Sequence, residues 1–285
     1  MSAIVWKLDV DHYGLTVIPQ QPRIGAEIYG IDLRAPLTSD LYEELISLLL
    51  QYKVLFFRDQ DLSREQHIAF GRRFGDLDVH PVVQADEPLI QAISAERIKR
   101  SSARVKGYTN RWHSDETFRP IPPLASILRA VEVPEIGGDT VFADAAAAYE
   151  GLPDEVKKWI DGLEAVHSLA HGLAWEETEQ WERLRSQYPP VTHPVVRIHP
   201  DSGAKVLFVN SVFTSHIVGL EKEESDRLLA QLNAQFTRPE YQVRFKWRKG
   251  SLAFWDNRST QHYGVWDFGE VTRELERVTI KGRAS

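Results

Sequence analysis

Trp112-His113-Ser114-Asp115 places an imidazole and a carboxylate two residues apart. On an extended segment such side chains leave the same face of the backbone, so both can reach one metal ion. A third ligand must come from elsewhere, and His262 is the best candidate because it follows a predicted buried strand at 251–256. Two histidines and one carboxylate on one face of an octahedral ion leave three positions open, the arrangement used by non-haem Fe(II) oxygenases for a bidentate co-substrate and dioxygen.

Other chemistry remains open for the same three side chains. Two histidines and a carboxylate also suit catalytic zinc, so a zinc hydrolase is an alternative. A metal-binding β-roll without catalysis, acting as a sensor or an assembly module, is another. The chain has no cysteine, which excludes disulfides, thiolate metal sites and a cysteine nucleophile.

Composition limits the class of protein. Hydrophobic residues make up 42% and charged residues 26% of the 285 residues, as in a soluble globular enzyme. The net charge of −7 argues against nucleic acid or an anionic membrane as a partner. Apolar runs such as Leu48–Leu50 are far too short to cross a bilayer, and residues 1–9 lack the apolar run of a secretory signal. We therefore expect a cytoplasmic enzyme.

Hydrophobic periodicity predicts helices and strands in different parts of the chain. The apolar spacing after Thr38 predicts a helix, and Ser63 with Gln66 forms a capping box for a second helix that ends near Gly75. Further helical patterns cover 153–160 and 221–233. Strands are predicted at 53–58, 195–198, 206–209, 241–248, 251–256 and 277–281.

The order of these elements predicts a fold that mixes α and β structure. No repeat and no linker rich in proline, serine or glycine divides the chain, so we expect one domain over 1–285. Strands with helices largely outside them favour a double-sheet β-roll, that is, a double-stranded β-helix (jelly-roll) core with flanking helices.

Several ordered motifs together resemble the taurine dioxygenase family. They comprise Trp112-His-Ser-Asp-Glu-Thr-Phe118, Gly137-Gly-Asp-Thr140, and Trp255-Asp-Asn-Arg-Ser-Thr-Gln-His-Tyr263 followed by Arg273 and Arg277, with Arg23–Leu33 near the start. The resemblance covers nearly the whole chain. It implies an Fe(II)- and 2-oxoglutarate-dependent dioxygenase that uses O2, forms succinate and CO2, and binds iron through His113, Asp115 and His262.

The resemblance also implies a site for the co-substrate. Arg273 stands eleven positions after His262, where the family places the arginine that pairs with the distal carboxylate of 2-oxoglutarate. Thr140, 27 positions after His113, matches a hydroxyl donor to the same carboxylate. A guanidinium binds a carboxylate through two parallel hydrogen bonds, which agrees with this role.

Four further residues are implied to contact the prime substrate. Arg277 and His80 match residues that hold an anionic head group, and Phe213 resembles an aromatic wall. The expected substrate is a small organic anion, with taurine or another alkylsulfonate first and an aryloxyalkanoate, sulfate ester or amino acid as alternatives. Glu116 departs from the apolar residue of the taurine enzymes; facing the pocket, it would favour a substrate that also carries a cationic or hydroxyl group. We expect a homodimer or homotetramer.

Overall fold

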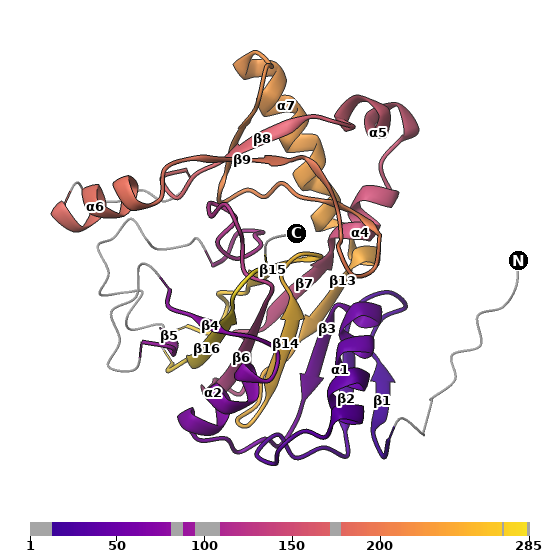
Figure 1. Cartoon of the computed structure of the whole chain (residues 1–285), viewed down its shortest axis with the longest axis vertical. Helices are drawn as coiled ribbons and strands as arrows, with labels where there is room; N and C mark the ends of the chain where they lie inside the picture. Colours follow the sequence, from indigo (N-terminus) through magenta and orange to yellow (C-terminus); the bar gives the residue numbers. More distant parts are fainter. Residues whose placement is uncertain (1–12, 81–87, 95–108, 172–177, 270, 284–285) are drawn as a thin grey trace, which may run out of the picture.

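The computed structural model describes residues 13–80, 88–94, 109–171, 178–269 and 271–283. Within these ranges the protein combines α-helices and β-strands around two central sheets (Figure 1). None of the described helices has the length and apolar character needed to cross a membrane.

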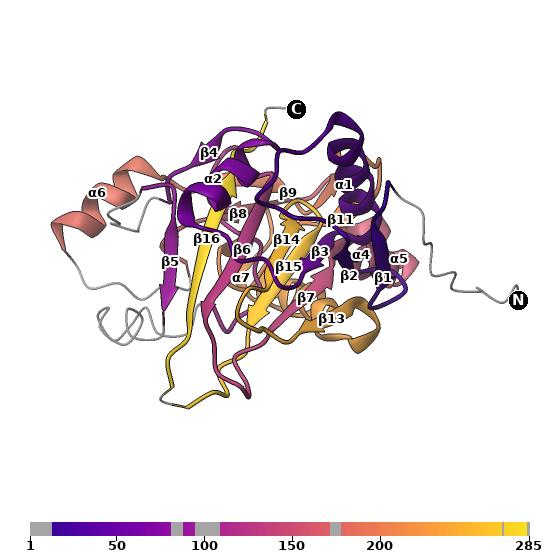
Figure 2. The same ribbon diagram turned by 90° about the horizontal axis from the view of Figure 1, so that it is seen from below.

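An eight-stranded sheet forms the larger half of the core. Its strands follow the order β1-β2-β3-β14-β6-β16-β4, and β5 also pairs with β16. Figure 2 shows β5, β16, β6 and β14 side by side. The strands are β1 (Thr16–Pro19), β2 (Ala26–Tyr29), β3 (Val54–Phe57), β14 (Leu252–Asp256), β6 (Ala125–Glu132), β16 (Glu274–Ile280), β4 (Leu77–Asp78) and β5 (Gln91–Ser94).

Two helices cover one face of this sheet, α1 (Ser39–Tyr52) and α2 (Arg64–Arg72). Both predicted starts are confirmed, because the side chain of Thr38 accepts a hydrogen bond from the first turn of α1 and the capping box at Ser63 is complete. The leucines of α1 pack with apolar residues of β3, β14 and β16 in one buried cluster. This cluster fixes the outer face of the large sheet.

A smaller antiparallel sheet packs against the other face, in the order β13 (Gln242–Phe245), β7 (Thr140–Asp144) and β15 (Thr260–Gly264). Its aromatic residues meet those of the large sheet; the rings of Phe56 and Phe245, for example, stack at 4.1 Å between centroids. The strand predicted at 241–248 is shorter in the structure. It begins only at Gln242, because residues 239–241 form a 3-10 turn, η2 (Pro239–Tyr241). The predicted burial of Val243, Phe245 and Trp247 is confirmed.

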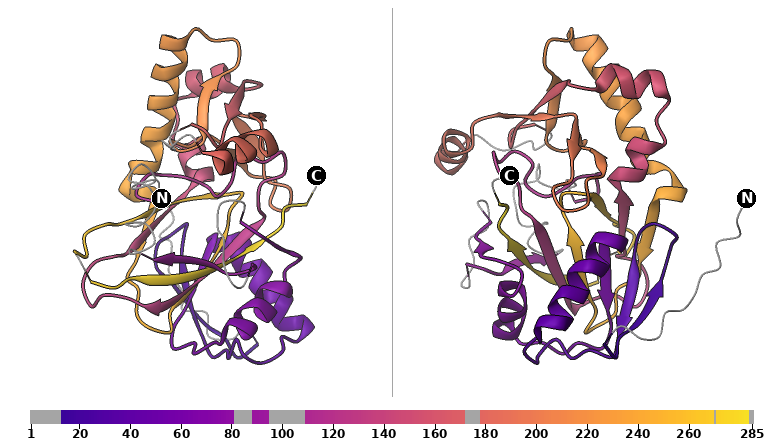
Figure 3. Two further views of the ribbon diagram at one scale, coloured as in Figure 1. Left: turned by 90° about the vertical axis from the view of Figure 1, so that its left-hand side faces the viewer. Right: turned by 45° about the vertical axis from the view of Figure 1, so that its right-hand side comes forward.

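A layer of helices and short strands lies beyond one end of the two sheets (Figure 3). Its own apolar cluster packs α4, α5 and α7 against short strands. The members are α4 (Ala145–Glu150), α5 (Asp154–Ile160), β8 (Glu164–His167), α6 (Glu179–Gln187), β9 (Val191–Pro194), β10 (Val196–Ile198), β11 (Lys205–Leu207), β12 (Thr214–Ile217), α7 (Lys222–Ala234) and η1 (Gln235–Thr237). The predicted hairpin is confirmed as β10–β11.

Candidate metal centre and anion sites

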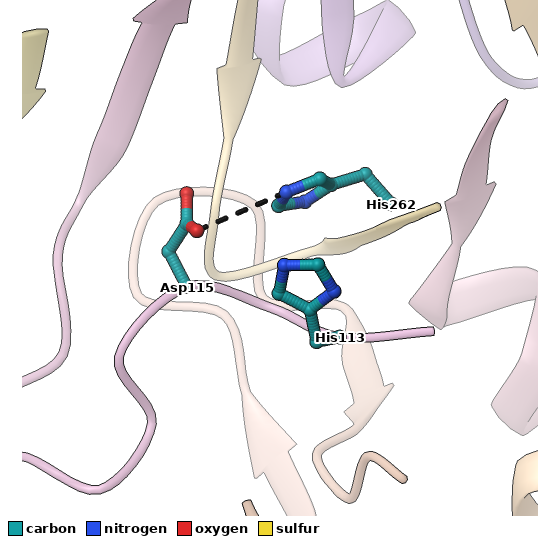
Figure 4. A group of neighbouring side chains, drawn as sticks. All are labelled: His113, Asp115 and His262. Atoms are coloured by element: carbon teal, nitrogen blue, oxygen red, sulfur yellow. Dashed lines mark ion pairs between the residues drawn. The ribbon is translucent and has the colours of Figure 1, made fainter. Parts of the chain in front are cut away.

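His113, Asp115 and His262 converge beside β15, an edge strand of the smaller sheet (Figure 4). Each offers one ligand atom, and these atoms lie within 4.8 Å of one another. A β-bridge joins the two histidine backbones: the N–H of His262 donates to the carbonyl of His113 at 2.8 Å, and the reverse bond measures 3.2 Å. His262 follows the buried strand β14, as expected, and lies within the next strand, β15; the bridge brings it to the His113–Asp115 segment.

Hydrogen bonding and burial hold the two imidazoles in the form that binds metals. Nδ1 of His113 donates to the carbonyl of Arg111 at 2.7 Å, because a carbonyl can only accept, and Nε2 is left to act as ligand. Burial lowers the pKa of His113 and lowers that of His262 to about 3. Both rings are therefore neutral at physiological pH, as metal coordination requires.

Three neighbours hold Asp115, two at its carboxylate and one at its backbone. Ser126 on β6 donates to Oδ2 at 3.0 Å, and Arg277 forms an ion pair with Oδ1. The side-chain amide of Asn257 bonds the backbone N–H and carbonyl of Asp115 at 2.7 and 2.9 Å. Although burial alone would raise the pKa of Asp115, the charge of Arg277 keeps it below its usual range. The carboxylate is thus ionised and fixed in direction.

The alternation of β16 directs Arg277 toward this centre. Successive side chains of a strand point to opposite faces. Leu275 and Arg277 face the smaller sheet, whereas Val278 lies in the cluster under α1 and α2. Glu276 takes the outer direction, where it pairs with arginines of α2 and β6. Glu276 is thus engaged by Arg64 and Arg129 on the face of β16 opposite to Arg277.

Arg273, just before β16, is buried next to the glycine motif of the sequence. Its Nε donates to the carbonyl of Gly138 at 2.9 Å, and its guanidinium lies 5.7 Å from the ring centroid of Phe268. Gly138 has φ +72°, and a Cβ there would approach the Arg273 side chain to 3.1 Å, so a larger residue would displace the arginine. Burial lowers the pKa of Arg273 to about 10, which still leaves it charged at neutral pH.

The residues expected to bind 2-oxoglutarate line a pocket beside the metal centre. Thr140 and Arg273 line it together with His262 and Arg277. Within the described ranges no ion pair neutralises Arg273, since its neighbour Asp139 is paired with Arg244 at 2.6 Å. A buried guanidinium next to a hydroxyl group suits a carboxylate ligand. The other lining residues are Ile93, Thr109, Leu128, Trp255, Gly264, Trp266 and Leu275.

The head-group cluster, formed by His80, Glu116, Arg119 and Arg277, lies on the Asp115 side of the centre. Oε1 of Glu116 is 3.8 Å from Nε2 of His80 and 4.0 Å from Nη2 of Arg277, and Oε2 is 2.5 Å from Nε of Arg119. Glu116 is only 2% exposed and has a left-handed φ of 51°. The residue that departs from the family pattern therefore faces the two side chains expected to hold an anion.

Phe213 forms part of a wall beside the histidines. Its ring lies edge-on to His113 at 6.5 Å and to Phe118 at 5.1 Å between centroids. It is both a core residue and a neighbour of the metal centre. The sequence also offers the basic segment Ala95–Asn110 as a candidate mobile lid, but its residues 95–108 lie outside the described residues.

Three residues that hold or pair with the site residues were not predicted from the sequence to belong to the site. Asn257 lies within the quoted 255–263 motif, so the match to the family could have drawn attention to it. Ser126 is an ordinary strand serine without any such signal. Arg119 stands near the ligand motif, but its pairing with Glu116 and with Asp78 at 2.8 Å depends on the turn at 116–119.

Comparison with known proteins identifies the group to which this chain belongs. Residues 16–279 match the family described as "Taurine catabolism dioxygenase TauD, TfdA family". The chain belongs to this family. It is an Fe(II)- and 2-oxoglutarate-dependent dioxygenase, an oxidoreductase that uses O2.

Similar proteins include sulfate-ester enzymes and a taurine dioxygenase. An alkylsulfatase of Acinetobacter baylyi is 38% identical, over 92% of this chain and 84% of its own length. An alpha-ketoglutarate-dependent sulfate ester dioxygenase of Pseudomonas putida is also 38% identical, over 94% and 90%. The crystal structure of a taurine dioxygenase from Burkholderia xenovorans has a TM-score of 0.80 at 37% identity, covering 94% of this chain and 91% of that one.

Proposed function

We propose that this dioxygenase oxidises a small organic anion with a sulfur oxyanion head, either an alkylsulfonate or an alkyl sulfate ester. The observation that carries the proposal is the burial of Arg277 beside the three candidate metal ligands, directed by the alternation of β16. We further infer that the two central sheets form a double-stranded β-helix within a single domain.

In this proposal His113, Asp115 and His262 bind the iron. The donor set fits, because two neutral imidazoles and an ionised carboxylate already lie within 4.8 Å of one another and suit a divalent ion of this type. Bound iron, with 2-oxoglutarate and O2, supplies the oxidising power for hydroxylation of a C–H bond. Arg273 binds the distal carboxylate of 2-oxoglutarate and Thr140 donates its hydroxyl hydrogen to the same group; the oxygen of that hydroxyl accepts from Trp247 at 2.9 Å, which orients it.

The prime substrate binds on the other side of the ligands. Arg277 and His80 hold its head, and the ring of Phe213 bounds the space next to His113. Arg277 pairs with Asp115 here, and binding of a cation by Asp115 would weaken that pair and make the guanidinium available to a substrate anion. A tetrahedral sulfur oxyanion has three oxygens to share between an arginine and a histidine. Positioning of one C–H bond and exclusion of water are then the tasks of the protein.

Sulfate esters and sulfonates share the head group but differ at the atom that is released. Hydroxylation of the carbon next to oxygen or sulfur makes an unstable product, which expels sulfate or sulfite. The names of the two relatives that are 38% identical favour testing sulfate esters alongside sulfonates. Aryloxyalkanoates and amino acids complete the set of candidates.

The test is a panel of alkyl sulfates, alkylsulfonates, aryloxyalkanoates and amino acids, assayed with Fe(II), 2-oxoglutarate and O2. We expect substrate-dependent succinate formation that is largest with a sulfur oxyanion and is lost in His262→Ala. Release of alcohol and sulfate without O2 or succinate would instead favour the zinc hydrolase alternative. Turnover of neutral compounds but of no anion would reject the assignment of Arg277.

A further inference from the structure

A second cavity lies apart from the metal pocket, between the loop after the ligand motif and the β10–β11 hairpin. Its volume is about 310 Å³, at the lower end of the range of about 300–1,000 Å³ for pockets that hold small molecules. We name it the proline pocket after Pro120, Pro122 and Pro123, which line one side. Arg197, Arg258 and Arg283 line it together with a single carboxylate, Asp201.

Two of these charged residues, Arg258 and Asp201, already pair with each other within the protein. Arg258 pairs with Asp256 and with Asp201, in each case at 2.6 Å. His199 in turn donates from Nε2 to Asp256 at 2.9 Å, while its Nδ1 accepts from the backbone of the hairpin turn. This network is internally complete, so it contributes no free cation to the pocket.

Arg197 is different, because its guanidinium is partly buried without a carboxylate among the described residues. It lies 4.5 Å from the ring centroid of Phe208. That ring in turn contacts His167 and His193, whose pKa values burial lowers, so both are neutral. Burial and the charge of Arg258 both act against the charge of Arg197 and lower its pKa. A desolvated cation that faces neutral groups and a cavity is stabilised when an anion binds there.

Apart from His199 and Asn257, the rest of the pocket is largely apolar. Ile121 is 47% exposed and Ile198 is 68% exposed, and both line the cavity beside the prolines. The exposed Arg283 lies at the chain's C-terminal side of the same cavity. An organic ion with one anionic group and a short hydrocarbon part would match both surfaces.

We propose that the proline pocket is a second binding site for a small amphiphilic anion, with Arg197 as the main contact to its charged group. The site is separate from the substrate position, because none of its lining residues is a candidate ligand or lines the metal pocket. One lining residue, Asn257, also holds the backbone of Asp115, so an occupant would lie directly behind the metal ligand.

The test is calorimetric titration of the anaerobic enzyme, loaded with Fe(II) and 2-oxoglutarate, using hexyl sulfate, hexanoate and neutral hexanol as probes. The anion that binds this pocket could be the substrate of the reaction or an unrelated metabolite. Binding of hexyl sulfate but not of hexanoate at the second site would indicate the substrate. Binding of both anions would indicate an unrelated metabolite. Arg197→Gln should weaken the second site about tenfold or more, as expected for loss of a charge-assisted hydrogen bond, and Arg277→Ala should leave it intact.

Two controls separate a binding role from a structural one. Arg283→Gln changes an exposed side chain, so we expect the fold to stay intact and the same site to weaken severalfold. Arg183→Gln, an exposed arginine of α6, should leave it unchanged. The proposal is overturned if neither Arg197→Gln nor Arg283→Gln changes the second site, or if hexanol binds there as tightly as hexanoate.

Discussion

Replacing Glu116 with Gln should strengthen the binding of anionic substrates. Glu116 is the one carboxylate in the head-group cluster, and it faces both Arg277 and His80. A sulfate or sulfonate held by these two side chains must lie beside the glutamate charge. Gln has nearly the same shape, so the substitution removes the charge and leaves the packing of this buried position largely unchanged.

The size of the effect follows from the distances. Oε1 of Glu116 lies 4.0 Å from Nη2 of Arg277 and 3.8 Å from Nε2 of His80, which puts a bound head group roughly 5 Å from the carboxylate. At an effective dielectric constant of about 20, two like charges at that distance repel by about 3 kcal/mol. Arg119, 2.5 Å from Oε2, offsets part of this repulsion. Burial raises the pKa of Glu116 to about 7, so the carboxyl group is fully charged only above that pH. At about pH 8.5 we therefore expect a gain of about 1–2 kcal/mol, or roughly five- to thirtyfold in KM, and a smaller gain at pH 7, where the glutamate can take up a proton as the anion binds.

The assay is succinate formation at saturating 2-oxoglutarate, with an alkyl sulfate varied in the wild type and in Glu116→Gln. KM should fall with little change in kcat, because the repulsion acts in the ground state as well as in the transition state. Glu223→Gln, an exposed site on α7, has the same change of charge and should behave as wild type. An unchanged or higher KM in Glu116→Gln would refute the placement of the head group beside Glu116.

Four other substitutions have distinct expected results. His262→Ala should abolish iron-dependent turnover while circular dichroism reports an intact fold; retained activity would exclude it as a ligand. Arg273→Ala should raise the KM for 2-oxoglutarate by the equivalent of about 1.5–3 kcal/mol, whereas Arg277→Ala should raise the KM for the prime substrate. Steady-state kinetics with 2-oxoglutarate and the prime substrate varied in turn would reveal whether the two arginines have exchanged roles. For Asp256, burial raises the pKa but hydrogen bonds from His199 and Arg258 outweigh it and lower the pKa to about 2. Its folded pKa is thus below the unfolded value, so its stabilisation is present above about pH 4 and is lost as pH falls toward 2, by on the order of 2 kcal/mol. Denaturant unfolding of Asp256→Asn should show a flatter acid limb than wild type, and an equally steep limb would contradict this assignment.

The sequence predicted best the features whose signal is local. The capping box at Ser63 and the alternation of 241–248 each depend on a few adjacent residues, and both appear in the structure. The central strand β6 was missed, because 125–132 is buried on both sides over most of its length and so lacks the alternation that identifies a half-exposed strand. The first two strands were missed as well, since their four residues lack the continuous apolar run that marked β3.

In the candidate site, too, the sequence predicted the feature that depends on adjacent residues and left open those that depend on tertiary structure. The pair His113 and Asp115 follows from strand geometry, but the approach of His262 depends on a backbone bridge between segments about 150 residues apart. The orientation of Glu116 depends on a left-handed turn that its own residue type disfavours, so the sequence left it open. The prediction of a cytoplasmic homodimer or homotetramer stays a prediction.

The bridge between His113 and His262 also bears on how the protein acquires its metal. The backbone bridge and the hydrogen bonds of Asp115 with Ser126 and Asn257 are made by the chain itself, so the fold contributes to ordering the three ligands and less of the free energy of metal binding is needed for it. A ready-made site of this kind does not select its ion through folding. Ions that bind nitrogen and oxygen ligands more tightly than Fe(II), such as Zn(II), can occupy it, and activity then depends on which metals the surroundings supply.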